Sequence, residues 1–254
     1  MCVFSYSIGE LRWAGDTDSN VKTIHAGGTS VSPMRDYTNS NPMNVFKAKS
    51  GQIFPKAFIS PDSEDTPRSL FRPSMEEEPK LLPSEWTSSS LNKFLVCTDG
   101  ACLRNGAHDA NAGCAFVFAR PSKWPYFNVV RFLLEDRDLN NQMHRRTSNR
   151  AELRAAIHAC QVPEWTREGF DTMVIATDSE YVVKGATEWI HDWIKNGWWR
   201  SPGNPVEDRD LWEWLLREMD RLAKMGISVE YWHISRKLNE IADRHAKIAA
   251  RKRL

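Results

Sequence analysis

Four acidic residues stand where a protein fold could bring them together to do chemistry. Asp99, in a Thr-Asp-Gly sequence, and Asp178, in Thr-Asp-Ser, each come at the end of a short apolar stretch that predicts a strand. Glu152 and Asp243 fall in the first turns of two predicted helices. One such acid alone is more often a turn or helix-capping residue. The ends of strands in α/β sheets are nevertheless where sites are built. Convergence of all four at one edge of a sheet is therefore the hypothesis to test.

Four carboxylates in one place would require cations, because neighbouring like charges raise one another's pKa. Carboxylate oxygens suit hard ions such as Mg²⁺, with Mn²⁺ as an alternative. Two such ions about 3.5–4 Å apart can activate a water molecule and stabilise the leaving oxygen of a phosphodiester. The pattern indicates metal-assisted hydrolysis.

Alternating strands and helices would position these acids. Apolar stretches predict strands, and repeats of apolar residues at helical spacing predict helices. The predicted strands are 94–98, 113–118, 127–134, 173–177 and 227–234, and the predicted helices are 148–161, a helix from Ser179, 208–225 and a last helix from about Asn239. Three successive strands followed by strands separated by helices predict a mixed α/β sheet with an antiparallel and a parallel half.

Five ordered segments of the second half resemble the successive motifs of the type 1 ribonuclease H family. They are FLVCTDGACLRNG, RTSNRAELRAAIHA, VIATDSEYVVKGATEWIHDWIKNGWW, NPVEDRDLWEWL and LNEIADRHA. The resemblance runs from about residue 93 to the end. It implies a ribonuclease H-like fold, a five-stranded mixed sheet with helices on both faces.

The resemblance also implies an activity: metal-dependent, endonucleolytic cleavage of the RNA strand of an RNA–DNA hybrid, leaving 5′-phosphates. The family's metal-binding and catalytic carboxylates fall on Asp99, Glu152, Asp178 and Asp243. Two Mg²⁺ ions are the implied cofactor.

Substrate contacts are implied by the same resemblance. Asn105, Ser148 and Asn149 would face the RNA near the cut, and Arg145 with Thr147 would hold a DNA phosphate. An arginine suits that role because its planar fork can bind two phosphate oxygens.

The tryptophans of the segment ATEWIHDWIKNGWW allow two interpretations. Trp189 and Trp193 would lie along the DNA strand by resemblance, whereas large aromatic residues are usually mostly buried. The two interpretations weigh equally for Trp193. Trp212 and Trp214 are expected in the core.

Three positions depart from the family pattern. Asp208 occupies a place in the phosphate pocket that is usually Asn, so it would repel phosphate, and we expect it to serve mainly as a helix N-cap. The mobile-loop histidine of the family has no counterpart: His233 aligns with the preceding strand end, and Arg236 or Lys237 stands near its place. Ser148 replaces a frequent Asn.

These departures keep a second hypothesis open, a non-catalytic nucleic-acid-binding or scaffold module on the same fold. Retention of all four carboxylates argues against it, since unneeded acids in one pocket would repel one another. A retroelement-derived domain ranks third, because no polymerase motifs flank the segment.

The chain divides near residue 90. Residues 1–90 contain 8 of the 13 prolines, no sustained periodicity and a charge of −2, from 9 basic and 11 acidic residues. Such a segment buries too little apolar surface to order itself. We therefore expect a largely disordered extension over 1–90 and a ribonuclease H type 1 domain over 91–254.

The whole chain of 254 residues is 41% hydrophobic and 26% charged, with a net charge of +1, which is typical of a soluble globular protein. We expect no transmembrane segment and no secretory signal. Five cysteines without paired spacing favour a reducing, intracellular compartment over a disulfide framework. The expected partner is an RNA–DNA hybrid, with no membrane association, and the protein is expected to be a monomer.

Overall fold

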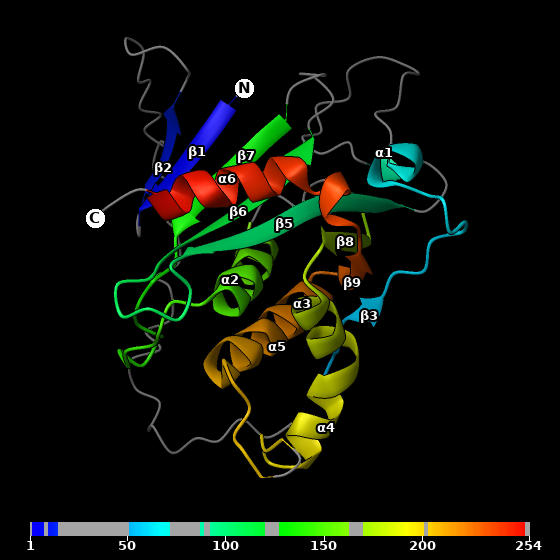
Figure 1. Cartoon of the computed structure of the whole chain (residues 1–254). Helices are drawn as coiled ribbons and strands as arrows, with labels where there is room; N and C mark the ends of the chain where they lie inside the picture. The colour runs from blue at the N-terminus through cyan, green and yellow to red at the C-terminus, as the bar shows by residue number, and fades with distance from the viewer. Residues whose placement is uncertain are drawn as a thin grey trace, which may run out of the picture.

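A computed structural model describes residues 2–7, 10–14, 51–71, 87–88, 92–119, 127–162, 170–200 and 203–251. These residues form a nine-stranded sheet with helices packed on both faces (Figure 1). The strand order is β2-β1-β7-β6-β5-β8-β9-β3, and β4 pairs with one end of β5.

Five strands make the centre of this sheet. The long strand β5 (Lys93–Leu103) pairs antiparallel with β6 (Asn111–Ala119), which pairs antiparallel with β7 (Phe127–Leu133). On its other side, β5 pairs parallel with β8 (Thr172–Thr177), which pairs parallel with β9 (Ser228–His233). The predicted mixed sheet is confirmed. Four further strands join it: β1 (Cys2–Ser7), β2 (Glu10–Ala14), β3 (Lys56–Ala57) and β4 (Thr87–Ser88).

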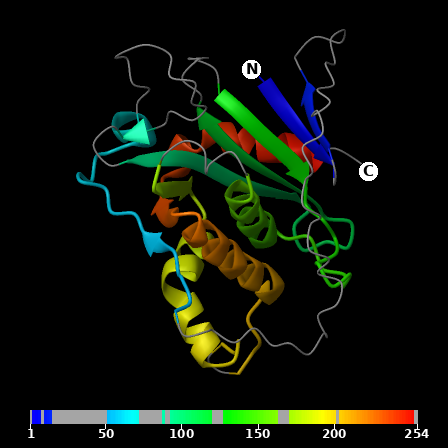
Figure 2. The ribbon, with the colours of Figure 1, turned by 180° about the vertical axis from the view of Figure 1, so that it is seen from behind.

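Helices α2 (Ser148–Cys160) and α5 (Arg209–Lys224) cover one face of the sheet, and α6 (Glu240–Arg251) covers the other (Figures 1 and 2). The alternation of side chains along each strand supplies both cores. Phe94 and Val96 of β5 face α2 and α5, while Leu95 and Cys97 lie in the core on the side of α6. The helical segment predicted from Ser179 consists of α3 (Glu180–Lys184), a π-helical turn (Gly185–Trp189) and α4 (Ile190–Lys195).

One glycine allows α6 to lie close to the sheet. A Cβ atom on Gly113 of β6 would come within 2.3 Å of the Ala250 backbone nitrogen and 2.5 Å of the Ala246 backbone oxygen. Helix and strand backbones therefore touch here, which fixes the height of α6, and of Asp243 on it, above the sheet.

Within the expected disordered extension, residues 2–7, 10–14, 51–71 and 87–88 differ from the expectation, because they join the sheet or dock on it. β3 pairs with the outer edge of β9, and a short helix α1 (Pro67–Leu70) follows it. Phe58 and Phe71 are buried in the core that α6 covers, beside Trp232. The prolines prevent long elements in this segment, but they do not prevent two aromatic anchors from docking on a preformed sheet. Most of the remainder of 1–90 lies outside the described residues.

No helix in the described part of the chain is both long and apolar enough to cross a membrane. Four of the five cysteines are described with their side chains, and all four are free thiols: Cys97, Cys102, Cys114 and Cys160.

Candidate active site

Asp99 and Asp178 come from adjacent parallel strands. Asp99 lies within β5 and is only 3% exposed, and Asp178 directly follows the last residue of β8. β5 and β8 are paired in register from Lys93 with Thr172 to Cys97 with Ala176. Asp178 leaves the end of β8, and the parallel register places Asp99 beside it. The expectation that Asp99 ends its strand was wrong, because β5 continues to Leu103 through its pairing with β6.

Asn239 ties this end of the sheet to the start of α6. Its Nδ2 atom donates to Oδ1 of Asp178 at 2.8 Å and to the backbone oxygen of Thr98 at 3.0 Å. The side chain is 1% exposed. Asn239 was not among the predicted site residues, and its only sequence signal is its position before the last helix.

Gly100 brings α2 to Asp99. A Cβ atom on Gly100 would lie 2.1 Å from the backbone nitrogen of Glu152, so only glycine permits this approach of strand and helix. The Gly100 backbone also hydrogen-bonds both carboxylates, which partly offsets the rise in pKa that burial causes in each. The Thr-Asp-Gly sequence thus supplies an acid and the space for a second acid beside it.

Burial and mutual repulsion oppose ionisation of the inner carboxyl groups. Burial is the largest cause that raises the pKa of Asp99, followed by the charges of Asp178 and Asp243, and together they bring it to about 8. Burial, then Asp99 and Asp178, hold the pKa of Glu152 well above its usual range. Arg236 adds a compensating positive charge to both. The predicted mutual effect of the acids is therefore present.

Asp243 differs from the inner acids because cations already bond both of its oxygens. Arg236 donates to Oδ1 at 2.6 Å and Lys247 to Oδ2 at 2.7 Å. Burial raises the pKa of Asp243, but the bonds from Lys247 and Arg236 outweigh it, and the net shift is downward. Asp243 is thus an ionised carboxylate at the rim of the site.

The inner carboxylates fit a divalent cation. Oδ2 of Asp99 and Oε2 of Glu152 are buried, and neither accepts a hydrogen bond from any part of the chain that the structure describes. Leaving buried carboxylate oxygens without donors is costly unless something else binds them. Hard oxygen ligands of this kind are those that Mg²⁺ and Mn²⁺ take.

The predicted substrate contacts lie in the turn after β5, in the loop before α2 and at the start of α2. Thr147 is the N-cap of α2, where its hydroxyl accepts the Arg150 backbone N–H at 3.1 Å, and Ser148 is the first helical residue. Asn105, Arg145 and Asn149 are exposed. Their roles remain predictions.

The tryptophans form a connected row. Trp189 packs on Trp193 with ring centres 5.8 Å apart, and Trp193 packs on Trp212 at 5.3 Å. Trp212 is fully buried, as expected, whereas Trp214 is partly buried and lies against the Arg154 guanidinium. Trp189 is 37% exposed, so the outer end of the row is available to a ligand.

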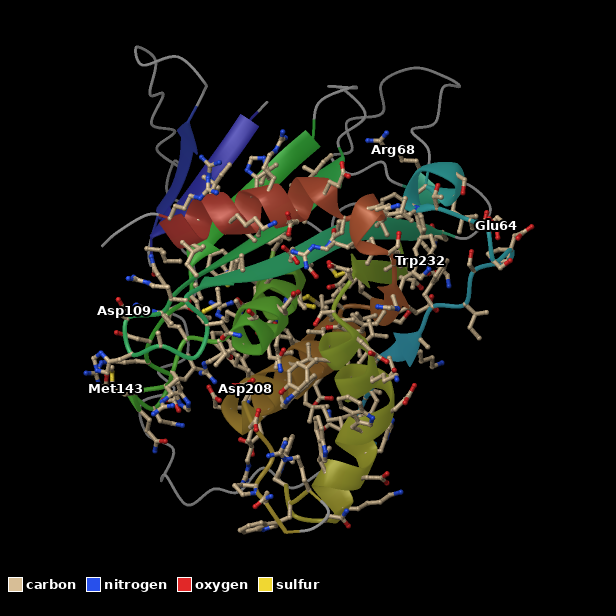
Figure 3. The ribbon with its side chains drawn as sticks, in the orientation of Figure 1. Glu64, Arg68, Asp109, Met143, Asp208 and Trp232 are labelled. Atoms are coloured by element: carbon tan, nitrogen blue, oxygen red, sulfur yellow. The ribbon has the colours of Figure 1, made fainter. Side chains whose placement is uncertain are left out.

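Asp208 stands at the N-cap position of α5, but its side chain does not cap the helix. Its backbone is left-handed, with φ 54° and ψ 29°, whereas a capping residue is normally extended. The carboxylate instead accepts from Arg150 and from the Tyr181 hydroxyl, both at 3.3 Å (Figure 3 labels Asp208). The expected capping role was wrong, because these partners draw the side chain inward.

A second polar cluster joins the loop before α2 to α5. Nε2 of His144 lies 3.1 Å from Asp138 and 3.8 Å from Asp210. Asp210 is also bonded by Arg150 through two nitrogens, and Asp138 accepts two backbone N–H groups of its own loop. These oxygens are already satisfied, so the cluster is a structural link.

Comparisons with known proteins show the family of the chain. The ribonuclease H (RNase H) family model matches residues 92–251. The ribonuclease H of Treponema pallidum subsp. pallidum is 38% identical over 161 residues, covering 61% of this chain and 89% of that protein. The ribonuclease H of Hahella chejuensis is 34% identical over 161 residues, covering 63% and 94%. Among solved structures, LC9-RNase H1, a type 1 RNase H with the type 2 active-site motif, is 28% identical with a TM-score of 0.43, covering 69% of this chain and 74% of that one.

Proposed function

The chain belongs to the ribonuclease H family of enzymes, and from this premise we propose that it cleaves the RNA strand of RNA–DNA hybrids. The cut is endonucleolytic and leaves 5′-phosphates. The observation that carries the proposal is the pair of buried carboxylate oxygens, on Asp99 and Glu152, which have no donor within the described residues. We further propose that residues 91–254 form the catalytic domain and act as a monomer.

Two divalent cations, Mg²⁺ or Mn²⁺, would be held by Asp99, Glu152, Asp178 and Asp243. When bound, such ions activate the attacking water and stabilise the leaving oxygen of the phosphodiester. Asn239 orients Asp178 through its 2.8 Å hydrogen bond.

The residues around the site would bind the hybrid by its two different backbones. Arg145 and Thr147 would hold a phosphate of the DNA strand, and Asn105, Ser148 and Asn149 would contact the 2′-hydroxyls of the RNA. The 2′-hydroxyl is the group that distinguishes RNA from DNA. Trp189 and Trp193 would lie against the deoxyriboses, since aromatic faces pack on apolar sugar surfaces.

The test is cleavage of one end-labelled strand presented as RNA–DNA hybrid, double-stranded RNA or double-stranded DNA, with Mg²⁺ or with a chelator. We expect cleavage of the hybrid alone, and only with Mg²⁺. Asp178→Asn keeps the side-chain volume but removes a ligand charge, so it should lower kcat by at least about 100-fold, since bound metal supplies several kcal/mol. Asp192→Asn is the matched control, because Asp192 is an exposed acid of the neighbouring helix α4. Wild-type rates from the Asp178→Asn enzyme would refute the assignment.

One observation favours a second candidate, a non-catalytic hybrid-binding protein. Arg236 and Lys247 already bond both oxygens of Asp243, so a cation at this acid must displace them. Hybrid binding without cleavage in either Mg²⁺ or Mn²⁺ would select this alternative.

A further inference from the structure

Residues Gly51–Phe71, hereafter the N-terminal docking segment, lie outside the stretch that the family model matches. The segment runs along the sheet edge formed by β9. Lys56 and Ala57 pair with Glu230 and Tyr231, and the Phe58 backbone N–H donates to the Tyr231 oxygen at 2.8 Å. Figure 2 shows the segment running from the side of α4, past β3, to α1.

Two aromatic side chains, Phe58 and Phe71, pack near Trp232 and are the upper anchors of the segment. The Phe58 ring centre lies 5.0 Å from that of Trp232, and the Phe71 ring centre lies 6.3 Å from it. Phe58 and Phe71 are 7% and 1% exposed, so both are core residues. Figure 3 labels Trp232 and, on α1, Arg68, at the same end of the molecule.

The lower part has separate anchors. The Gln52 side chain donates to Asp220 of α5 at 2.8 Å, and Phe54 packs on His191 of α4 with ring centres 4.2 Å apart. The partners of these lower anchors belong to α5 and α4 and not to the loop between β9 and α6.

The upper anchors share one core with the loop that completes the active site. This loop joins β9 to α6 and contains Asn239, the residue that bonds Asp178. Ile234 at its start and Ala242 just after it lie in the same cluster as Phe58 and Phe71. A cavity of about 200 Å³ lies between Thr66–Arg68 of the segment and Lys237–Ala242 of the loop.

We propose that the N-terminal docking segment positions the loop between β9 and α6. Phe71 and Phe58 are the positioning residues, and they act through Trp232. The inference rests on the proposed function. The middle of the six-residue loop, Ser235–Leu238, is exposed, whereas Ile234 and Asn239 at its two ends are buried, so the loop is held at its ends. Through the core that its two aromatic anchors share with Ile234 and Ala242, the segment restricts how Asn239 and Asp243 can move. A small displacement of a catalytic group lowers the reaction rate strongly, because the reaction requires a narrow range of distances and angles.

The test uses the full-length chain with Phe71→Ala and two matched variants. Phe71→Leu keeps most of the volume and should rescue the effect. Phe54→Ala removes a phenyl ring from the same segment but from its lower anchor. Hydrogen exchange of metal-free protein is followed at two amides that report on the loop: Asn239, which donates to Arg236, and Asp243, which donates to Asn239. Steady-state cleavage of the hybrid is measured in parallel, well below the melting temperature.

We expect Phe71→Ala to raise exchange at these two amides about tenfold and to lower kcat about tenfold with little change in KM. Phe71→Leu and Phe54→Ala should stay within about twofold of wild type in both. A structural role alone would raise exchange in β3 and α1 while leaving the loop amides and kcat unchanged, and that result overturns the proposal. Faster loop exchange with an unchanged kcat overturns it as well. If Phe71→Ala does not fold, Phe71→Val, which removes less of the side chain than alanine and more than leucine, takes its place with the same two measurements.

An inactive wild-type protein would instead refute the proposed function, and the catalytic consequence with it. The exchange measurement needs no metal and no substrate. It therefore still decides whether the segment holds the loop.

Discussion

Replacing Asp99 with Asn should stabilise the metal-free protein while abolishing cleavage. The pKa of Asp99 rises from an unfolded value of 3.8 to about 8 in the fold, chiefly through burial and then through repulsion by Asp178 and Asp243. An acid whose pKa is raised by folding contributes stability that is complete below its unfolded pKa and is lost as the pH rises through its folded pKa. Asn resembles the protonated acid in shape and never ionises, so it avoids this loss.

The size of the effect follows from the shift. Each pKa unit corresponds to about 1.4 kcal/mol, and the rise from 3.8 to about 8 sets an upper limit of about 6 kcal/mol. Glu152 and Asp178 belong to the same acidic cluster, and protons redistribute among interacting acids, so the full limit is not reached. We expect the free energy of unfolding of Asp99→Asn to exceed that of wild type by about 2–4 kcal/mol at pH 9 and by about zero at pH 4.

The assay is urea denaturation of both proteins in a chelator between pH 4 and pH 9, read as the free energy of unfolding. Asp210→Asn is the control. Arg150 bonds Asp210, so removing the charge of Asp210 should lower the stability of the protein. Mg²⁺ should stabilise the wild type and have much less effect on Asp99→Asn, since a ligand stabilises only the state that binds it. An Asp99→Asn protein that is no more stable than wild type at pH 9, or equally more stable at pH 4, would refute the reasoning.

Two further predictions concern neighbours of the site. Gly100→Ala should destabilise the protein by about 3 kcal/mol or more and remove activity, because the added Cβ would lie 2.1 Å from the Glu152 backbone nitrogen. Thermal melting and hybrid cleavage check this prediction. A Gly100→Ala protein as stable as wild type would contradict the close approach of β5 and α2. Asp208→Asn should leave KM for the hybrid within about twofold of wild type at low and high salt, because the Asp208 carboxylate is paired with Arg150 and turned inward. A KM that falls below the wild-type value at low salt, and returns to it at high salt, would show that the carboxylate faces a phosphate.

The central sheet and its helices could be predicted from the sequence because their signals are local. Apolar stretches such as Phe94–Thr98 and Met173–Thr177 predict strands, and both lie in strands, β5 and β8. Asp178 follows the end of β8 as predicted, whereas β5 continues past Asp99 because β6 pairs with it. The N-terminal docking segment could not be predicted. Its order depends on β9 and Trp232, about 170 residues away, and two-residue β3 has no periodicity to detect. The inward turn of Asp208 was missed for the same reason, since its partner Arg150 is 58 residues distant.

The site also shows how acids with different roles can be told apart. Asp210 has a cationic partner within the fold, Arg150. One oxygen of Asp99 and one oxygen of Glu152 are buried and have no donor within the described residues. A carboxylate that only stabilises the fold would not be kept buried without a partner, because an unpaired buried charge is destabilising. Removing the charge should therefore raise stability and lower activity at Asp99, whereas at Asp210 it should lower stability. Opposite signs of these two effects identify a functional acid without reference to any relative.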